Sequence, residues 1–322
     1  MQTRTKRQLL LALFLVLGGV ILFGGLMTML NWDFTKLSTS RYETNCYEIP
    51  EDYQSISVLT KNANVVLLPA EDGKCRIVCR EQKTLRHSVE VRDGALTVEV
   101  TDTRKWYDYI SLFSFESPCI TLYLPQEAYG ALTVKASTGN VNLPAAFQFD
   151  TMEITTSTGD VTAEASVTGA LTVKVSTGNV AVRGVQAGSI SLSASTGDIT
   201  VSDTVCAGEV CLRVSTGDTV LSRLTCASLV SMGRTGDLTL RDTQVSGLCS
   251  IERSTGDVRF DKCDALELRV STNTGDVTGS LLSQMLFDAQ SRTGKVTVPS
   301  PSGSRPCLIR TGTGTIHLTV EE

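Results

Sequence analysis

The stretch LTVKVSTGNVAVRGVQAGSI, residues 171–190, contains one unit of the repeat that decides the fold. Its Thr-Gly-Asn tripeptide, or a close variant, occurs ten times, and successive glycines are 19 or 20 residues apart. The ten glycines are Gly139, Gly159, Gly178, Gly197, Gly217, Gly236, Gly256, Gly275, Gly294 and Gly314. A repeat of this length predicts a stacked architecture in which each unit contacts only its neighbours.

Apolar residues keep fixed distances from these glycines. An apolar residue stands seven positions before each glycine, five positions before it in every unit except at Ser231, and two positions after it except at Thr219. The residues between them are mostly polar, so the pattern alternates with period two, as in strands with one buried face. Residues 145–298 contain no proline, which suits hydrogen-bonded strands. The sequence therefore predicts an all-β fold, a β-solenoid of about ten coils of 19–20 residues.

The N-terminal region has a different character. Residues 9–30 contain no charge and no proline, and at ~1.5 Å per residue they can cross a bilayer. Arg4, Lys6 and Arg7 precede this segment, which favours a cytoplasmic N-terminus and an extracytoplasmic remainder. A cleaved signal peptide is the alternative, although the apolar run is longer than a signal core and no small-residue cleavage site follows it.

These patterns divide the chain into five segments. We expect a basic cytoplasmic tail at 1–8, a transmembrane anchor at 9–30, a linker at 31–41, an N-terminal β cap at 42–130 and solenoid repeats at 131–322. The cap contains strand-like runs and, at residues 62–65, a degenerate copy of the repeat turn. Solenoid ends need covering because their strand edges are otherwise unpaired.

The composition excludes several functional classes. The chain has 322 residues, a formal net charge of −5 and only two histidines, and it has no long basic run. We therefore expect no nucleic-acid partner, no histidine-based triad and no cofactor. His87 and His317 are expected on solvated strand faces. Enzymes built on β-helices have protruding loops around a cleft, whereas the turns here are short and uniform, so we expect no catalytic activity.

The acidic residues of the turns are candidate cation ligands. Stacking should align Asp160, Asp198, Asp218, Asp237, Asp257 and Asp276 along one edge, in a row with Asn140 and Asn179. Ca²⁺ takes six to eight oxygen ligands, which a carboxylate ladder could supply. The other interpretation is structural, because Asp or Asn beside a turn glycine satisfies local backbone amides.

Cysteine and aromatic residues give two further candidates. Cys206 and Cys226 each lie nine residues after a repeat glycine, so stacking places them one coil apart, within disulfide range on an oxidising surface. Cys249 and Cys307 have the inward register and should replace leucine in the core. The aromatic cluster before the repeats is either a binding lip or a plug for the open end of the rod. It consists of Trp106, Tyr107, Tyr109, Phe113 and Phe115.

The start of the repeats resembles a known family. The run LYLP at 122–125, Tyr129, the LTV at 132–134 and the STGNV at 137–141 are similar to the signature of the bacterial "putative adhesin" domain family. The resemblance covers residues 50–320. It implies a membrane-associated envelope protein built of repeated β units, with no catalytic residues; some members are associated with envelope-stress response systems.

Two functions fit these expectations. The first is a membrane-anchored, extracytoplasmic β-solenoid that acts as a non-catalytic binding or scaffold module of the bacterial cell envelope. Its partners would be the lipid bilayer through residues 9–30 and a cell-wall polymer, a surface or a membrane protein. The alternative is an envelope-stress sensor or regulator that works through a membrane partner. The terminal coil, which ends at residues 320–322, is expected to expose an edge available for self-association.

Overall fold

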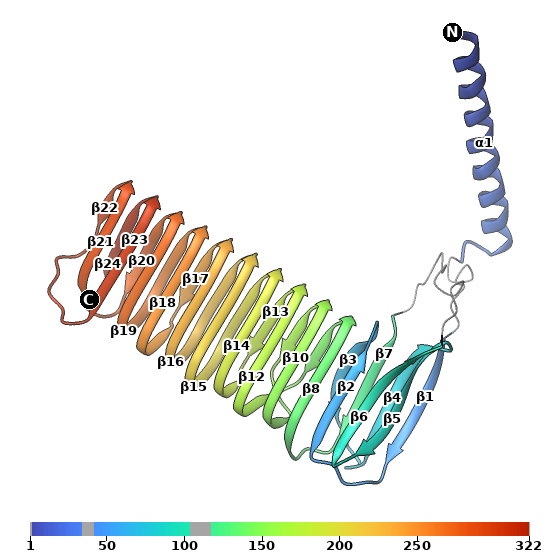
Figure 1. The fold of residues 1–322 in the computed structure, drawn as a ribbon, viewed down its shortest axis with the longest axis horizontal. Helices are drawn as coiled ribbons and strands as arrows, with labels where there is room; N and C mark the ends of the chain where they lie inside the picture. The colour runs from blue at the N-terminus through green and yellow to red at the C-terminus, as the bar shows by residue number, and fades with distance from the viewer. Residues whose placement is uncertain (1, 34–41, 104–116, 322) are drawn as a thin grey trace.

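A computed structural model describes residues 2–33, 42–103 and 117–321. Helix α1 (Gln2–Met29) is followed by strands that stack into a rod (Figure 1). The helix is long and apolar enough to cross a membrane by length and composition. The strands form one continuous sheet that coils along the rod, so the predicted β-solenoid is confirmed.

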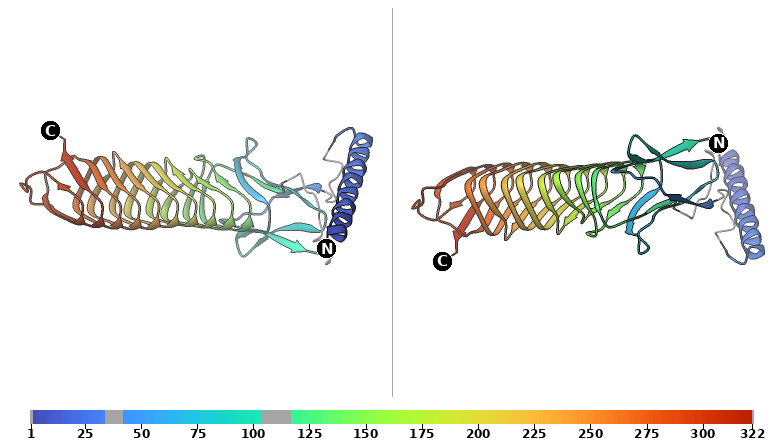
Figure 2. Two further views of the ribbon diagram at one scale, coloured as in Figure 1. Left: turned by 90° about the horizontal axis from the view of Figure 1, so that it is seen from above. Right: turned by 90° about the horizontal axis from the view of Figure 1, so that it is seen from below.

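The cap strands lie at the N-terminal end of the rod, where they fan out from it (Figure 2). They are β1 (Tyr42–Ile49), β2 (Ser55–Thr60), β3 (Asn64–Pro69), β4 (Cys75–Gln82), β5 (Leu85–Arg92), β6 (Ala95–Asp102) and β7 (Cys119–Leu124). β4 pairs antiparallel with β1 and β7, and β5 pairs antiparallel with β6. β2 and β3 instead pair in parallel with β8 and β9 of the first repeat. The cap therefore supplies a starting coil on which the repeats stack.

The repeats form the rest of the rod, and we number their coils 1–10 by turn glycine, from Gly139 to Gly314. The strands are β8 (Ala128–Thr138), β9 (Val141–Leu143), β10 (Gln148–Thr158), β11 (Val161–Ala163), β12 (Ser166–Thr177), β13 (Val180–Arg183), β14 (Gln186–Thr196), β15 (Ile199–Thr216), β16 (Thr219–Thr235), β17 (Leu238–Arg241), β18 (Gln244–Thr255), β19 (Val258–Thr274), β20 (Val277–Leu281), β21 (Leu286–Thr293), β22 (Val296–Thr297), β23 (Pro306–Thr313) and β24 (Ile316–Val320). Each strand pairs in parallel with its equivalent in the coil that lies beside it along the rod, as Leu171 does with Ile190.

The core is a column of small and medium apolar side chains inside the coils. Rows of valine, isoleucine and leucine, for example Val173, Leu192 and Leu212, are almost completely buried. Cys249 and Cys307 are buried in the same column, which confirms their expected place. Because the interior of a coil is narrow, the rod accommodates few aromatic rings, in agreement with the 6% aromatic content.

The last two coils exchange places in space. β23 lies between β19 and β21, and β24 lies between β20 and β22, so coil 10 is inserted between coils 8 and 9. Residues 298–305 lead back into the rod, where Arg305 Nη1 lies 3.0 Å from both carboxylate oxygens of Asp264. The expectation that coil 10 forms the terminal edge is wrong for most of this coil, because β23 is paired on both sides and Ile316 and His317 of β24 lie between β20 and β22. Leu318–Val320 pair with β20 alone among the described residues, so an exposed edge at the end of β24 stays a prediction. The hypothesis of self-association now applies to the edge formed by β21 and β22.

Candidate functional site

The acidic turn residues form a hydrogen-bonded ladder along the rod. From coil 1 to coil 8, the side chain of the Asp or Asn accepts a hydrogen bond from the backbone N–H of its equivalent in the next coil along the rod. Asp198 accepts from Asp218, and Asp218 from Asp237, at 2.8 Å in both cases. The ladder begins at Asn64, which accepts from Asn140, and ends at Thr315, which donates to Asp276. One oxygen of each ladder carboxylate is therefore engaged in joining coils.

This geometry predicts how the ladder responds to substitution. Asp218→Asn keeps an acceptor oxygen and should change the free energy of unfolding by less than ~0.5 kcal/mol, whereas Asp218→Ala should cost about 1 kcal/mol. Urea denaturation of both variants, with and without millimolar Ca²⁺, measures these values. Stabilisation of the wild type by Ca²⁺ that disappears in Asp218→Asn would instead support the cation interpretation, which stays a prediction.

The other two candidates from the sequence are the disulfide between Cys206 and Cys226 and the aromatic cluster before the repeats. Cys206 and Cys226 are register partners in β15 and β16, as the spacing predicts, and both are buried. Both thiols are free in this structure, and burial raises the pKa of Cys226 to about 12. The disulfide between them stays a prediction. Trp106, Tyr107, Tyr109, Phe113 and Phe115 lie outside the described residues, so the lip and plug hypotheses remain predictions too.

His87 is buried in the cap, and its expected place on a solvated face is wrong. Its backbone N–H and its ring Nδ1 both lie within 2.7 Å of Glu81 Oε2, and its Nε2 lies 3.0 Å from the hydroxyl of Thr60. Because a carboxylate only accepts hydrogen bonds, Nδ1 carries a proton and donates a hydrogen bond to Glu81. The hydrogen bonds to the buried Glu81 carboxylate stabilise His87 in the interior, although histidine is more often found at the surface.

Glu81 is held as an anion by this network. Burial by itself would raise the pKa of Glu81, but hydrogen bonds from His87 and from the Asn45 side chain outweigh it and lower the pKa below its ordinary value. Cys79 lies beside the pair, and the three side chains offer ligand atoms within 4.8 Å of one another. Burial raises the pKa of the Cys79 thiol to about 12. Glu81 and both ring nitrogens of His87 are already engaged in hydrogen bonds within the protein. We therefore assign the cluster a structural role.

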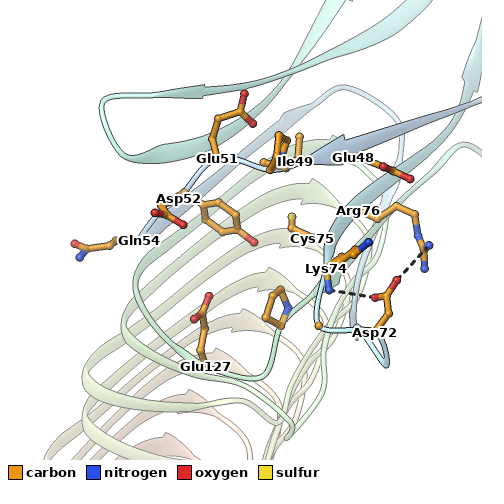
Figure 3. Close-up of a pocket in the computed structure, with 14 residues that line it drawn as sticks. Glu48, Ile49, Glu51, Asp52, Gln54, Asp72, Lys74, Cys75, Arg76 and Glu127 are labelled. Atoms are coloured by element: carbon orange, nitrogen blue, oxygen red, sulfur yellow. Dashed lines mark hydrogen bonds and ion pairs between the residues drawn. The ribbon is translucent and has the colours of Figure 1, made fainter.

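A cleft opens where the cap meets the starting coil (Figure 3). Its volume is about 720 Å³. Three segments line it: the end of β1 with the β1–β2 loop, the turn before β4, and the loop between β7 and β8. These segments are far apart in the sequence, and the stacking of β2 on β8 brings them together. This cleft is the candidate functional site.

Acidic side chains dominate the lining of the cleft. It contains the five carboxylates Glu48, Glu51, Asp52, Asp72 and Glu127 and the two cations Lys74 and Arg76. Asp72 is 3.9 Å from the Arg76 guanidinium and also accepts a hydrogen bond from the Lys74 backbone (Figure 3). Clefts lined by one sign of charge concentrate ligands of the opposite sign. The cleft thus favours a ligand that carries positive charge.

Tyr53 forms part of the cleft wall. Its hydroxyl is buried beside the Cys75 thiol and the Tyr129 hydroxyl. Its ring stacks on Tyr129 with centroids 6.0 Å apart, and Tyr129 in turn stacks on Phe149 at 5.6 Å. Burial raises the pKa of both tyrosines, so both hydroxyls are protonated at neutral pH and can donate hydrogen bonds. Because its hydroxyl is buried against the Cys75 thiol and the Tyr129 hydroxyl, Tyr53 shapes the wall of the cleft.

The sequence did not reveal this cleft. Tyr53 and Tyr129 are 76 residues apart, and neither belongs to a recognisable motif. The available signal was the clustering of acids in residues 48–52 between two strand-like runs, which by itself is typical of a solvated loop.

Comparisons with known proteins agree with the fold. Residues 53–319 match the Toastrack DUF4097 family, a family of unknown function. A putative adhesin from Parabacteroides distasonis has a similar structure, with 16% identity, a TM-score of 0.50, and coverage of 74% of this chain and 98% of that chain. A putative lipid binding protein from the same organism has 17% identity, a TM-score of 0.50, and coverage of 75% and 98%. At these identities the likeness shows the fold alone. No curated protein matches the chain.

Proposed function

Since the chain belongs to the Toastrack DUF4097 family, we propose that it is a membrane-anchored, non-catalytic binding module of the bacterial cell envelope. In this proposal α1 holds the protein in the membrane and the rod lies outside the cytoplasm. The length and composition of the helix and the basic residues before it support this orientation. A solved protein described as a putative adhesin has the same fold, which supports a binding role.

The observation that carries the proposal is the acid-lined cleft where the cap meets the starting coil. A ligand with an ammonium or guanidinium group would find carboxylates on the β1–β2 loop. Glu51 and Asp52 are exposed on this loop and have no ion-pair partner within the part of the chain that the structure describes. They are free to pair with such a group on a polymer or a membrane protein.

A direct binding measurement tests this function. The full chain, in nanodiscs of neutral lipid, should bind a fluorescent tri-lysine peptide saturably, as followed by fluorescence anisotropy. The variant Glu51→Gln/Asp52→Asn removes two cleft charges and should bind the peptide about five- to tenfold more weakly, at up to ~1 kcal/mol per exposed charge. The control Glu153→Gln/Glu209→Gln removes two exposed acids from the rod and should bind it like the wild type.

Other outcomes would direct attention to other functions. Equal weakening by both double variants would mean that the peptide responds to net charge and not to the cleft. Loss of an envelope-stress response on deletion of the protein, without any binding of the peptide, would favour the sensor hypothesis. Turnover of an envelope glycan that depends on a single carboxylate would contradict the non-catalytic proposal.

A further inference from the structure

Coil 6 lacks two of the large apolar side chains with which coil 5 fills its interior. Five and three residues before its turn glycine it has Ser231 and Gly233, where its neighbours in coil 5 have Leu212 and Val214. Arg253 of coil 7 occupies the vacated space. A Cβ placed on Gly233 would lie within 2.4 Å of Arg253 Nη1. The two small residues therefore make room for one large cationic side chain.

Arg253 is a buried cation without a carboxylate partner among the described residues. Its side chain is only 5% exposed. Nη2 donates to the hydroxyl of Ser231 at 3.0 Å, and Nη1 donates to the backbone carbonyl of Glu252 at 3.2 Å. Both acceptors are neutral, and a guanidinium has five N–H groups. Desolvation lowers the pKa of Arg253 to about 10, so it stays charged at neutral pH. A buried charge of this kind is normally paired with an anion.

A hollow of about 550 Å³ lies beside Arg253 on the surface of the rod. We call it the arginine groove. Arg213, Arg234 and Arg253, from coils 5, 6 and 7, line it, together with five serines and a single acid, Glu252. Within the described residues, Arg213 and Arg234 have no ion-pair partner; Arg213 contacts only the Cys211 sulfur. The groove thus carries a formal charge of +2 on a chain whose net charge is −5.

The shape of the arginine groove indicates a linear ligand. Its lining extends from Ser193 in coil 4 to Ser271 in coil 8. At ~4.8 Å per coil, these five coils span about 19 Å along the rod axis. The three arginines come from coils 5, 6 and 7, and the Arg253 guanidinium reaches back to Ser231 and Gly233 of coil 6. The positive charge is therefore spread over more than one coil, so several charges on an extended chain can be bound at once. A compact solute would use only one end of the groove.

We propose that the arginine groove binds a linear phosphodiester polymer that lies along the rod. Arginine forks match phosphate oxygens, and the serine hydroxyls add neutral donors. A phosphodiester carries its charge within the backbone of the polymer, so the anion can approach the recessed Arg253. This site lies on coils 4–8, away from the cleft of the cap, and the proposal is independent of the function proposed for that cleft.

The test uses poly(glycerol phosphate) as the probe and the full chain in nanodiscs of neutral lipid. Because removal of Arg253 could unfold its coil, the test variant is Arg213→Gln/Arg234→Gln, in which both side chains are exposed. We expect at least tenfold weaker binding by calorimetry at physiological salt, and a weaker dependence of affinity on salt concentration. The control Arg183→Gln/Arg259→Gln removes two exposed arginines outside the groove and should bind the polymer as the wild type does.

Three outcomes would overturn the proposal. Absence of binding at physiological salt would show that the groove takes no such polymer. Equal losses in the test and control variants would show that attraction is unspecific. Equal affinity for polyglutamate would show that a carboxylate polymer serves as well, against the phosphodiester assignment. The cleft variant Glu51→Gln/Asp52→Asn should leave polymer binding unchanged, so failure of this proposal and failure of the proposed function are distinguishable.

Discussion

Replacement of Gly197 by alanine should destabilise the rod by about 4 kcal/mol or more. At this turn glycine φ is +134°, a conformation that side chains rarely adopt and that costs about 1–3 kcal/mol. In addition, a Cβ there would lie 2.0 Å from the carbonyl oxygen of Gly178 in the preceding coil. That oxygen is backbone, so the contact is relieved only when two coils move apart. The hydrogen bond from Gly197 N to the Thr216 carbonyl would be disturbed as well.

Gly184 provides a matched control for this prediction. It also has a positive φ, +65°, but a Cβ there would meet no atom within 4 Å. Gly184→Ala should therefore cost only the backbone strain, about 1–2 kcal/mol. Urea denaturation of the full chain in detergent, followed by far-UV circular dichroism, compares the two variants. Similar losses would mean that the close stacking of the turns is not what requires glycine.

The same turn glycines made the fold predictable from the sequence. Their spacing and the apolar rows beside them are local patterns repeated ten times, so each copy supports the others. The degenerate copy at residues 62–65 was recognisable for the same reason, and Asn64 indeed heads the side-chain ladder.

Repetition also concealed the order of the last coils. Coils 9 and 10 have the same rows of apolar residues, so either coil can stack on coil 8. Only the prolines at 299, 301 and 306 indicated that the segment between these two coils differs from the other connections.

The binding sites were less predictable because each depends on contacts between distant segments. Ser231 stood out in the sequence as a polar residue in an apolar row. Its cause is a distant contact, because the side chain of Arg253, 22 residues later, lies against Ser231 and Gly233. The cleft needs the β2–β8 pairing, which joins residues 76 positions apart. His87 lacked any local motif, and its burial follows from the position of Glu81 across a tight turn. In a single sequence, such long-range contacts are visible only as residues that depart from the local pattern.

Replacement of Glu81 by alanine should be the most destabilising change in the cap, at about 3–5 kcal/mol. The carboxylate accepts hydrogen bonds from the His87 backbone, the His87 ring and the Asn45 side chain. Without it these donors are buried without an acceptor, and the loss of one partner of a buried pair has a cost of this size. Glu99→Ala is the control, because that side chain is exposed on β6 and should change stability by less than ~0.5 kcal/mol. Urea denaturation compares the two; equal losses would contradict a structural role for the cluster.

The same carboxylate predicts a pH dependence of stability. Its pKa is lower in the folded protein than the ordinary value of 4.5, so the unfolded chain binds the proton more readily. The contribution of Glu81 to stability is therefore complete above about pH 4.5 and is lost as the pH falls through the lower folded pKa. Glu81→Gln cannot titrate, and the difference in unfolding free energy between wild type and this variant should shrink as the pH falls below 4.5. Other carboxylates also titrate in this range, but they are common to both proteins and cancel in the difference. A difference that stays constant from neutral pH down to acid would mean that Glu81 is not held as an anion by His87 and Asn45.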